Sequence, residues 1–571
     1  LWEAQIQLRK EVGTKTQDAL SIFGYTDDAE DSHTTIRQKD KIFSELYKSE
    51  HMKNAGPYAR LKFAMDYWCA LWFWPIDKAD LLPTRSEFLF DMSLILEGTM
   101  ASVNVTDSVK GGQLSLFPTE MEQMAMDIID TYGTDTIVDI PRLRKENPRL
   151  DLAARIAEQN KFMHWELEFA DLFAERGGFD LIIGNPPWIK LVWEEKNILA
   201  EKQPLLAIRS FSAAEVDALR AEELQNIKIY DDYLGEYVGT AAMQSFLGAK
   251  TNYAALQGMK VNLANCFLPT ALFYAREKGV TALIHPDTPF DATNGQMIRR
   301  LLYSRLRYHF HFINELRLFP DVHHNTVFSL NVYKNQATPQ FYAIFNLFAV
   351  EAIEDCFDSG CVYQLEGMKD SSGNWCIKGK PDRLITITKK DLKLFGQIFD
   401  ELAKEYDARL PIIHSRQLLE ILRDFEQVPS RLLDYETITC SNEMWHETNC
   451  SKNGLIRRKV HFPASAIDTI YSGSHIGNAN PLFKTSRRVC TKVSDFDPID
   501  LSIVGSDYIQ RVNYTPGKDM RFYWSQVATT EWGQKYTDHY RVVARRMLDL
   551  KGAKTVMACT SYKCSWVGFC R

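Results

Sequence analysis

The strongest constraint on the fold is a short apolar run that ends at two prolines. Phe179–Gly184 reads FDLIIG, is bounded by glycines and continues into Asn185-Pro186-Pro187-Trp188. Such a run is typical of a strand buried on both faces, as in a parallel sheet. Because proline cannot join a strand ladder, the chain must leave the sheet at the strand's carboxyl end. In open α/β sheets, ligands bind at that edge.

The residues after this run alternate between helical and strand patterns. We expect a helix over 262–277, a strand over 279–286, a helix over 295–306, and strands over 308–314 and 326–333. This order describes the second half of a doubly wound sheet with an antiparallel edge. The predicted fold class is therefore α/β, with a partial Rossmann-like sheet.

A chain of 571 residues is too long for one core and should contain several domains. Helical spacing over 58–72 and near 120–132 predicts a large helical region at 1–150. The segment 151–173 is also expected to be helical. We expect the α/β core at 151–350, a mainly helical linker at 351–425 and a mixed α/β domain at 426–571. No apolar stretch reaches the roughly 18 residues of a membrane span, so no membrane partner is expected.

The cysteines favour a reducing compartment. There are eleven, an odd number spread along the chain, which fits reduced thiols in the cytoplasm better than a disulfide framework. Cys559, Cys564 and Cys570 lack the paired spacing of structural zinc sites. We therefore expect no metal.

Charge is uneven along the chain. The net charge of −7 argues weakly against a nucleic-acid partner, but residues 451–546 hold 15 Lys and Arg against 8 Asp and Glu. Local charge sets the field that a phosphate meets. The candidate DNA contacts in this basic segment are Arg457, Arg458, Lys459, His475, Asn478, Lys484, Arg487 and Arg488. The alternative for any one of them is a plain surface charge.

The Asn-Pro-Pro-Trp segment suits the methylation of an exocyclic aromatic amine. The lone pair of such an amine is delocalised into the ring, and two acceptors on its N–H groups would free it. The Asn185 side-chain oxygen and the Pro186 carbonyl can supply these acceptors, with proline fixing the backbone. The Trp188 indole offers a face for a base flipped out of the duplex. The alternative is an ordinary tight loop.

These residues resemble a known family. Phe179–Trp188 resembles motif IV of adenine-N6 DNA methyltransferases, and His164–Phe173 is similar to the segment before that motif in large restriction–modification methylases. Asn262-Leu263 with Phe267, followed by Gly279–Pro286, resembles the later helix and strand of the same catalytic domain.

The resemblance extends toward the C-terminus. Leu318-Phe319-Pro320 resembles motif VIII, whose aromatic residue packs against the flipped adenine. The resemblance covers Asp151–Lys334, and beyond Ala408 the chain is similar to target-recognition domains of type IIG and phage-defence methylases such as those of DISARM and BREX systems. Those proteins are bacterial, cytoplasmic and longer than this chain.

The resemblance implies a site-specific adenine methyltransferase with double-stranded DNA as partner and S-adenosylmethionine as cofactor. Asn185, Pro186 and Pro187 would hold the amine, while Trp188 would stack on one face of the adenine and Phe319 would contact the other. The family's glycine-rich donor loop is not found before residue 185, since Gly111-Gly112 follows no strand. We expect that loop upstream of this chain or on another chain, with further defence-complex subunits as partners.

Three alternatives remain open. The first is a bifunctional type IIG endonuclease–methylase, for which Glu194-Glu195-Lys196 is only a chance-level match to a magnesium nuclease site. The second is a DNA-binding or specificity subunit without catalysis. The third, an RNA or protein-glutamine methylase, is disfavoured by the basic C-terminal domain.

Overall fold

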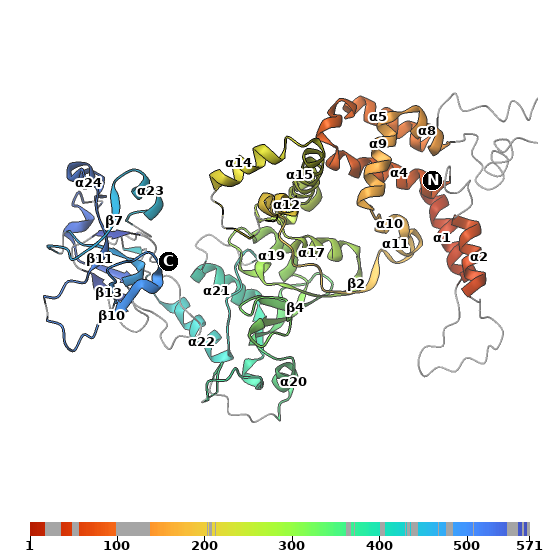
Figure 1. Ribbon diagram of the computed structural model, residues 1–571. Coiled ribbons are helices and arrows are strands. Elements are labelled where there is room, and N and C mark those ends of the chain that lie inside the picture. Colours follow the sequence, from red (N-terminus) through yellow and green to blue (C-terminus); the bar gives the residue numbers. More distant parts are fainter. Residues whose placement is uncertain are drawn as a thin grey trace, which may run out of the picture. The chain divides into compact units, whose positions relative to one another are not determined.

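The computed structural model forms two compact units, Leu1–Gln427 and Val428–Arg571 (Figure 1). The residues that it describes are 1–16, 36–47, 56–98, 138–202, 204, 208–209, 211, 213–360, 367–370, 372–399, 406–428, 430, 434–435, 444–465, 468–475, 484–505, 507–530, 532–544, 558–561 and 565–567.

The N-terminal region is helical where it is described, as the sequence predicts. Its helices are α1 (Trp2–Thr16), α2 (Ile36–Tyr47), α4 (Pro57–Ala70), α5 (Arg85–Leu96), α8 (Ile140–Glu146), α9 (Pro148–Asn160), α10 (Trp165–Glu168) and α11 (Ala170–Arg176), with short turns η1 (Leu71–Phe73) and η2 (Ile76–Leu81). The helix expected near 120–132, and Gly111-Gly112, lie outside the described residues.

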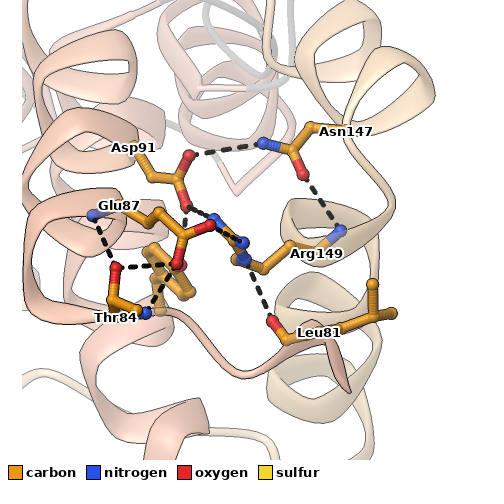
Figure 2. A network of polar contacts seen from close by, with 7 residues as sticks. Leu81, Thr84, Glu87, Asp91, Asn147 and Arg149 are labelled. Carbon is orange, nitrogen blue, oxygen red and sulfur yellow. Dashed lines mark hydrogen bonds and ion pairs between the residues drawn. The ribbon is translucent and has the colours of Figure 1, made fainter. Parts of the chain in front are cut away.

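A buried polar network joins α4, α5 and α9 (Figure 2). Arg149, in the first turn of α9, donates to Asp91 at 3.2 Å, to Glu87 at 2.8 Å and to the Leu81 carbonyl at 2.9 Å. The Tyr67 hydroxyl donates to the same Asp91 carboxylate at 2.8 Å. One guanidinium therefore fixes the helices around a buried acid.

The α/β core is a six-stranded mixed sheet with the order β1-β2-β4-β3-β5-β6. Its strands are β1 (Phe179–Gly184), β2 (Ala275–Pro286), β3 (Leu306–Ile313), β4 (Val327–Tyr333), β5 (Gln340–Leu347) and β6 (Ile385–Thr388). β1 is parallel to β2 and β3 is parallel to β5, whereas β4 is antiparallel to both β2 and β3. β6 is antiparallel to β5.

Helices lie between and after these strands, and some of them pack on the sheet. They are α12 (Glu195–Lys202), α14 (Ala213–Glu223), α15 (Ile227–Gly248), α16 (Lys250–Tyr253), α17 (Leu263–Tyr274), α18 (Thr288–Asp291), α19 (Gln296–Tyr303), α20 (Glu351–Phe357), α21 (Lys389–Phe399) and α22 (Arg416–Asp424), with turns η3 (Ala254–Leu256), η4 (Asn314–Leu316), η5 (Pro381–Arg383) and η6 (Phe425–Gln427). Apolar residues of α17, α19 and α21 share one core with the sheet. A second core joins β3, β4 and β5 to α20 and includes Trp188 and Phe319.

Three expectations about this sheet are corrected. The antiparallel strand β4 lies inside the sheet rather than at its edge, because it pairs with β2 on one side and β3 on the other. β1 is not buried on both faces: among the described strands it is an edge, and Leu181 and Ile183 are 57% and 73% exposed. β6 extends the sheet within the segment 351–425, which the sequence assigned to a linker.

The second unit is rich in short strands, as expected beyond residue 432. A four-stranded sheet has the order β14-β8-β11-β7, and two strand pairs accompany it. The elements are α23 (Glu447–Lys452), β7 (Ile456–His461), β8 (Ile470–Ser472), η8 (Gly473–His475), β9 (Lys484–Ser486), η9 (Val493–Asp495), β10 (Phe496–Pro498), β11 (Val512–Pro516), α24 (Met520–Gln526), η10 (Tyr536–Asp538), β12 (Arg541–Ala544), β13 (Ala558–Ser561) and β14 (Ser565–Val567).

Within the described residues, no helix has the length and apolar character needed to cross a bilayer. In the same described ranges, no three His, Cys, Asp or Glu side chains are grouped so that they could ligate a metal ion. Cys564 and Cys570 of the possible zinc trio lie outside them.

Candidate active site at the end of strand β1

The start of β1 is fixed by a glycine that no other residue can replace without a clash. Gly178 has φ +144°, and a Cβ on it would lie 2.4 Å from the Tyr274 carbonyl oxygen. Next to it, the Phe179 ring packs against Trp165 and Phe173, with ring centroids 5.8 and 5.5 Å away. These contacts hold the start of β1 against the aromatic residues of α10 and α11.

The Asn-Pro-Pro-Trp segment leaves the sheet where β1 ends, as the sequence predicts. Gly184 is the last residue of the strand and pairs in register with Leu283 of β2. Asn185 is exposed and Pro186 is buried. Among the described residues no hydrogen bond to the Asn185 side chain is recorded, so its amide oxygen is available as an acceptor.

Trp188 lies against the sheet and is partly exposed. Its indole N–H donates to the Ile284 carbonyl of β2 at 3.4 Å. Its ring packs on Phe328 of β4, with centroids 5.3 Å apart and planes tilted by 37°. The indole is thus anchored to the sheet, and part of its surface remains exposed.

Phe319 lies beside Trp188, but the two rings touch each other instead of leaving room for a base between them. Their centroids are 5.1 Å apart at an interplanar angle of 64°, and Phe319 also contacts Phe328. A base stacked between two parallel rings needs them about 7 Å apart, since each stacking contact takes about 3.5 Å. The expected sandwich is therefore not present in this conformation, and one ring must move to form it.

A buried polar cluster that the sequence analysis missed lies on the opposite face of the sheet. His285 of β2 accepts from the Asn331 amide at 2.8 Å, and the oxygen of the Asn331 amide accepts from His309 of β3 at 2.7 Å. Ser329 donates to Asp287 at 2.7 Å, just beyond the carboxyl end of β2. A signal was present in the sequence, because His309 and His311 alternate with the aromatic residues Tyr308, Phe310 and Phe312 along the strand.

Burial sets the charges of this cluster. It lowers the pKa of His285 and of His311 to about 4, so both rings are neutral at pH 7. Burial opposes ionisation of Asp287, but His309, His311 and the Ser329 hydroxyl together outweigh it and lower the pKa of that carboxyl. Behind the candidate site the cluster therefore combines two histidines with lowered pKa values, His285 and His311, and one carboxyl whose pKa is also lowered.

Glu194-Glu195-Lys196 is engaged in local contacts. Glu195 forms an ion pair with Arg220 at 2.8 Å and accepts from the Tyr233 hydroxyl, and these partners lower the pKa of Glu195 against the effect of burial. Lys196 donates to the Arg209 carbonyl at 3.3 Å. These acids and this lysine do not converge on a common point as a magnesium nuclease site requires.

In the second unit, the candidate DNA contacts fall into two groups. Arg457, Lys459 and Arg488 are exposed, with no ion pair recorded among the described residues. Arg458 instead pairs with Glu447 at 2.7 Å and donates to the Tyr514 hydroxyl, and Arg487 pairs with Asp497 at 2.8 Å. Lys484 is half-buried at the start of β9.

The prediction that His475 contacts DNA does not fit its position in the structure. It is fully buried and hydrogen-bonded to Ser472 and to the Arg511 carbonyl, and burial lowers its pKa to about 4. A neutral, enclosed ring can neither pair with a phosphate nor reach a base edge, so we remove it from the set. Asn478 lies outside the described residues.

Comparison with known proteins identifies a class for part of the chain. Residues 68–212 match the model of the Eco57I restriction-modification methylase family. This segment includes the Asn-Pro-Pro-Trp residues, and the match points to DNA methylation within a restriction–modification system. It confirms that part of the sequence-based expectation, while placement among DISARM or BREX systems stays a prediction. No curated protein sequence matches the chain.

Solved structures add remote likenesses. The cryoEM structure of a DrdV–DNA complex is 13% identical, with 31% of this chain and 16% of that chain covered and a TM-score of 0.18. A structure of a type I R-M system is 10% identical, with 46% of each chain covered and a TM-score of 0.20. The type ISP enzyme LlaBIII bound to DNA is 10% identical, with 31% and 11% covered and a TM-score of 0.17. The chain thus spans less than half of each of these proteins, and similarity at this level carries no functional argument.

Proposed function

We propose that this chain carries the target-base side of a site-specific DNA adenine-N6 methyltransferase of a bacterial restriction–modification or phage-defence system. The observation that carries the proposal is the geometry at the end of β1. An exposed Asn185 with an available amide oxygen stands beside buried Pro186, and a strand-anchored, partly exposed indole follows. The family match over the same residues supports it.

In this proposal the segment binds a flipped adenine. The Asn185 side-chain oxygen and the Pro186 carbonyl accept hydrogen bonds from the two N6–H groups, which favours a tetrahedral nitrogen with a localised lone pair. Trp188 supports the ring by stacking, worth roughly 1–3 kcal/mol per base. Because neither acceptor titrates near neutrality, the site binds the amine without an acid–base step. Phe319 contacts the base after it separates from Trp188.

S-adenosylmethionine is the methyl donor that such an enzyme uses, but the described residues do not form a recognisable cradle for it. In those residues, no glycine-rich turn joins a strand to a helix, and we assign no residue to the donor. The open edge of β1 supports a location for the donor-binding part. Leu181 and Ile183 expose apolar surface there, and β1 has no second neighbouring strand among the described residues, as expected where a further strand and its cover belong.

A second candidate is a DNA-binding subunit that does not transfer methyl groups, for which the exposed Arg457, Lys459 and Arg488 of the second unit supply candidate contacts. One assay separates the two. The chain, together with the protein part that supplies the donor site, is incubated with labelled S-adenosylmethionine and unmethylated DNA made by amplification, and N6-methyladenine is quantified after digestion to nucleosides. Methyl transfer supports the enzyme, whereas DNA binding without transfer supports the second candidate.

Substitution of Asn185 makes the assay specific. Asn185→Ala should lower transfer by about 10²–10³-fold, the usual cost of removing one preorganised hydrogen-bonding group in a transition state. Its fold should be intact, because Asn185 is exposed. Asn335→Ala is the matched control, since Asn335 is also exposed but follows β4, whose carboxyl end lies away from the carboxyl ends of β1 and β2. Full activity in Asn185→Ala would refute the proposed role.

A further inference from the structure

One buried carboxamide organises the segment that carries Phe319. Asn314 follows β3 directly and is fully buried. Its amide nitrogen donates to the Phe319 and Val322 carbonyls, each at 2.9 Å. Its side-chain oxygen accepts from the Phe319 backbone N–H at 3.0 Å. A single side chain thus binds both backbone polar groups of the residue whose ring meets Trp188.

The rest of the segment closes around the same residue. The Asn314 backbone N–H donates to the Thr326 carbonyl at 3.0 Å, and its carbonyl accepts from the Arg317 N–H at 2.8 Å. Arg317 has φ +54°, an uncommon conformation for a residue other than glycine. Residues 314–326 therefore form a loop whose backbone groups at Phe319 and Val322 hydrogen-bond to the Asn314 side chain.

This arrangement fixes the Phe319 ring through its backbone. With the Phe319 N–H and carbonyl both bound, the Cα can shift little, and the ring lies 5.1 Å from Trp188 and 5.0 Å from Phe328. Without the carboxamide, a buried donor and two acceptors would lose their partner, which a loop can avoid only by rearranging. The position of the ring thus depends on a residue that touches neither Trp188 nor the candidate base site.

We infer that Asn314 is a positioning residue for the target base: it holds the Phe319 segment so that the ring faces the Trp188 indole. This inference rests on the proposed function for its catalytic consequence, but its structural part does not. Asn314 contributes no atom to the base. It acts by restricting where the Phe319 ring can lie after this ring and the Trp188 indole have separated to admit a base.

A double-mutant cycle tests the inference. Asn314→Leu keeps the size of the side chain and removes its hydrogen bonds, and Phe319→Ala removes the ring. If Asn314 acts through Phe319, each variant should lower kcat by about tenfold with KM for DNA changed less than about twofold, and the double variant should lose no more than the worse single variant. Losses that multiply to about 100-fold would overturn the inference, because independent sites add in free energy.

Hydrogen–deuterium exchange supplies a readout that needs no activity. Asn314→Leu should speed exchange in residues 314–326 at least about tenfold while leaving β3 and β4 protected. Asn325→Ala, at an exposed position of the same loop, is the control and should change neither readout. Unchanged exchange in Asn314→Leu would overturn the inference. A wild-type protein that transfers no methyl group when its donor-binding part is present would refute the proposed function instead, and the exchange result would still decide whether Asn314 holds the loop.

Discussion

The buried histidines behind the candidate site should make the first unit lose stability in mild acid. His285 and His311 have pKa values lowered from 6.5 to about 4 by burial. A folded-state pKa below the unfolded one means that the unfolded chain binds protons first as the pH falls. Stability is therefore intact above pH 6.5 and is lost progressively between pH 6.5 and pH 4.

The size of this loss follows from the two pKa values. At pH 5 an unfolded histidine is almost fully protonated while its folded counterpart is mostly neutral, which costs about 2 kcal/mol per ring relative to pH 7. The pair together costs about 4 kcal/mol, a large part of the 5–15 kcal/mol that usually stabilises a domain. Neighbouring Asp287 keeps its charge over this range, because its pKa is lowered.

The free energy of unfolding of the first unit is measured in urea at pH 7 and at pH 5, with unfolding monitored by susceptibility to proteolysis. The double variant His285→Gln/His311→Gln should begin less stable at pH 7, because buried hydrogen bonds are disturbed, but should lose about 4 kcal/mol less than wild type between the two pH values. The exposed His323→Gln is the control and should follow wild type. An equal pH dependence in the double variant and the wild type would refute the reasoning.

Two further predictions concern the helical region and the basic domain. Arg149→Met should destabilise the first unit by about 3 kcal/mol in urea unfolding, since it leaves the buried Asp91 carboxylate without its cation; a loss under about 1 kcal/mol would contradict this. Arg457→Ala should reduce the slope of log K for DNA against log salt by about 1, whereas Arg458→Ala should leave it unchanged, because Arg458 is already paired with Glu447. Equal slopes in both variants would argue against a phosphate contact at Arg457.

Local signals predicted much of the candidate site. The glycine pair, the apolar run and the double proline fix the start of β1, its end and the point at which Asn185 leaves the sheet, because each acts through backbone sterics of adjacent residues. Asn314 was missed for a related reason. An asparagine after a strand indicates a turn in sequence, and only the folded loop reveals which carbonyls its amide reaches.

Non-local features were less accessible. The sequence predicted β4 as a strand, but its place between β2 and β3 depends on pairing that no short pattern encodes. The burial of β1 on both faces was predicted wrongly. An apolar run indicates that residues tend to be buried, but it does not show which elements cover them, and Leu181 and Ile183 are exposed in the described structure. β6 was missed because a strand as short as Ile385–Thr388 gives little periodic signal. The burial of His475 likewise arises from packing with Phe496 of β10.

The inserted position of β4 also has a consequence for how the chain matures on the ribosome. β2 is complete once Pro286 has been made, and β3 once Ile313 has been made, yet neither can pair with the other because Val327–Tyr333 must lie between them. Long-range pairing of this kind is slow, and nascent strands that wait for a partner are prone to associate wrongly. A nascent chain stopped before Val327 would hold β1 and β2 with no inner neighbour, so the Asn185 end of β1 can become stable only after Val327–Tyr333 has emerged.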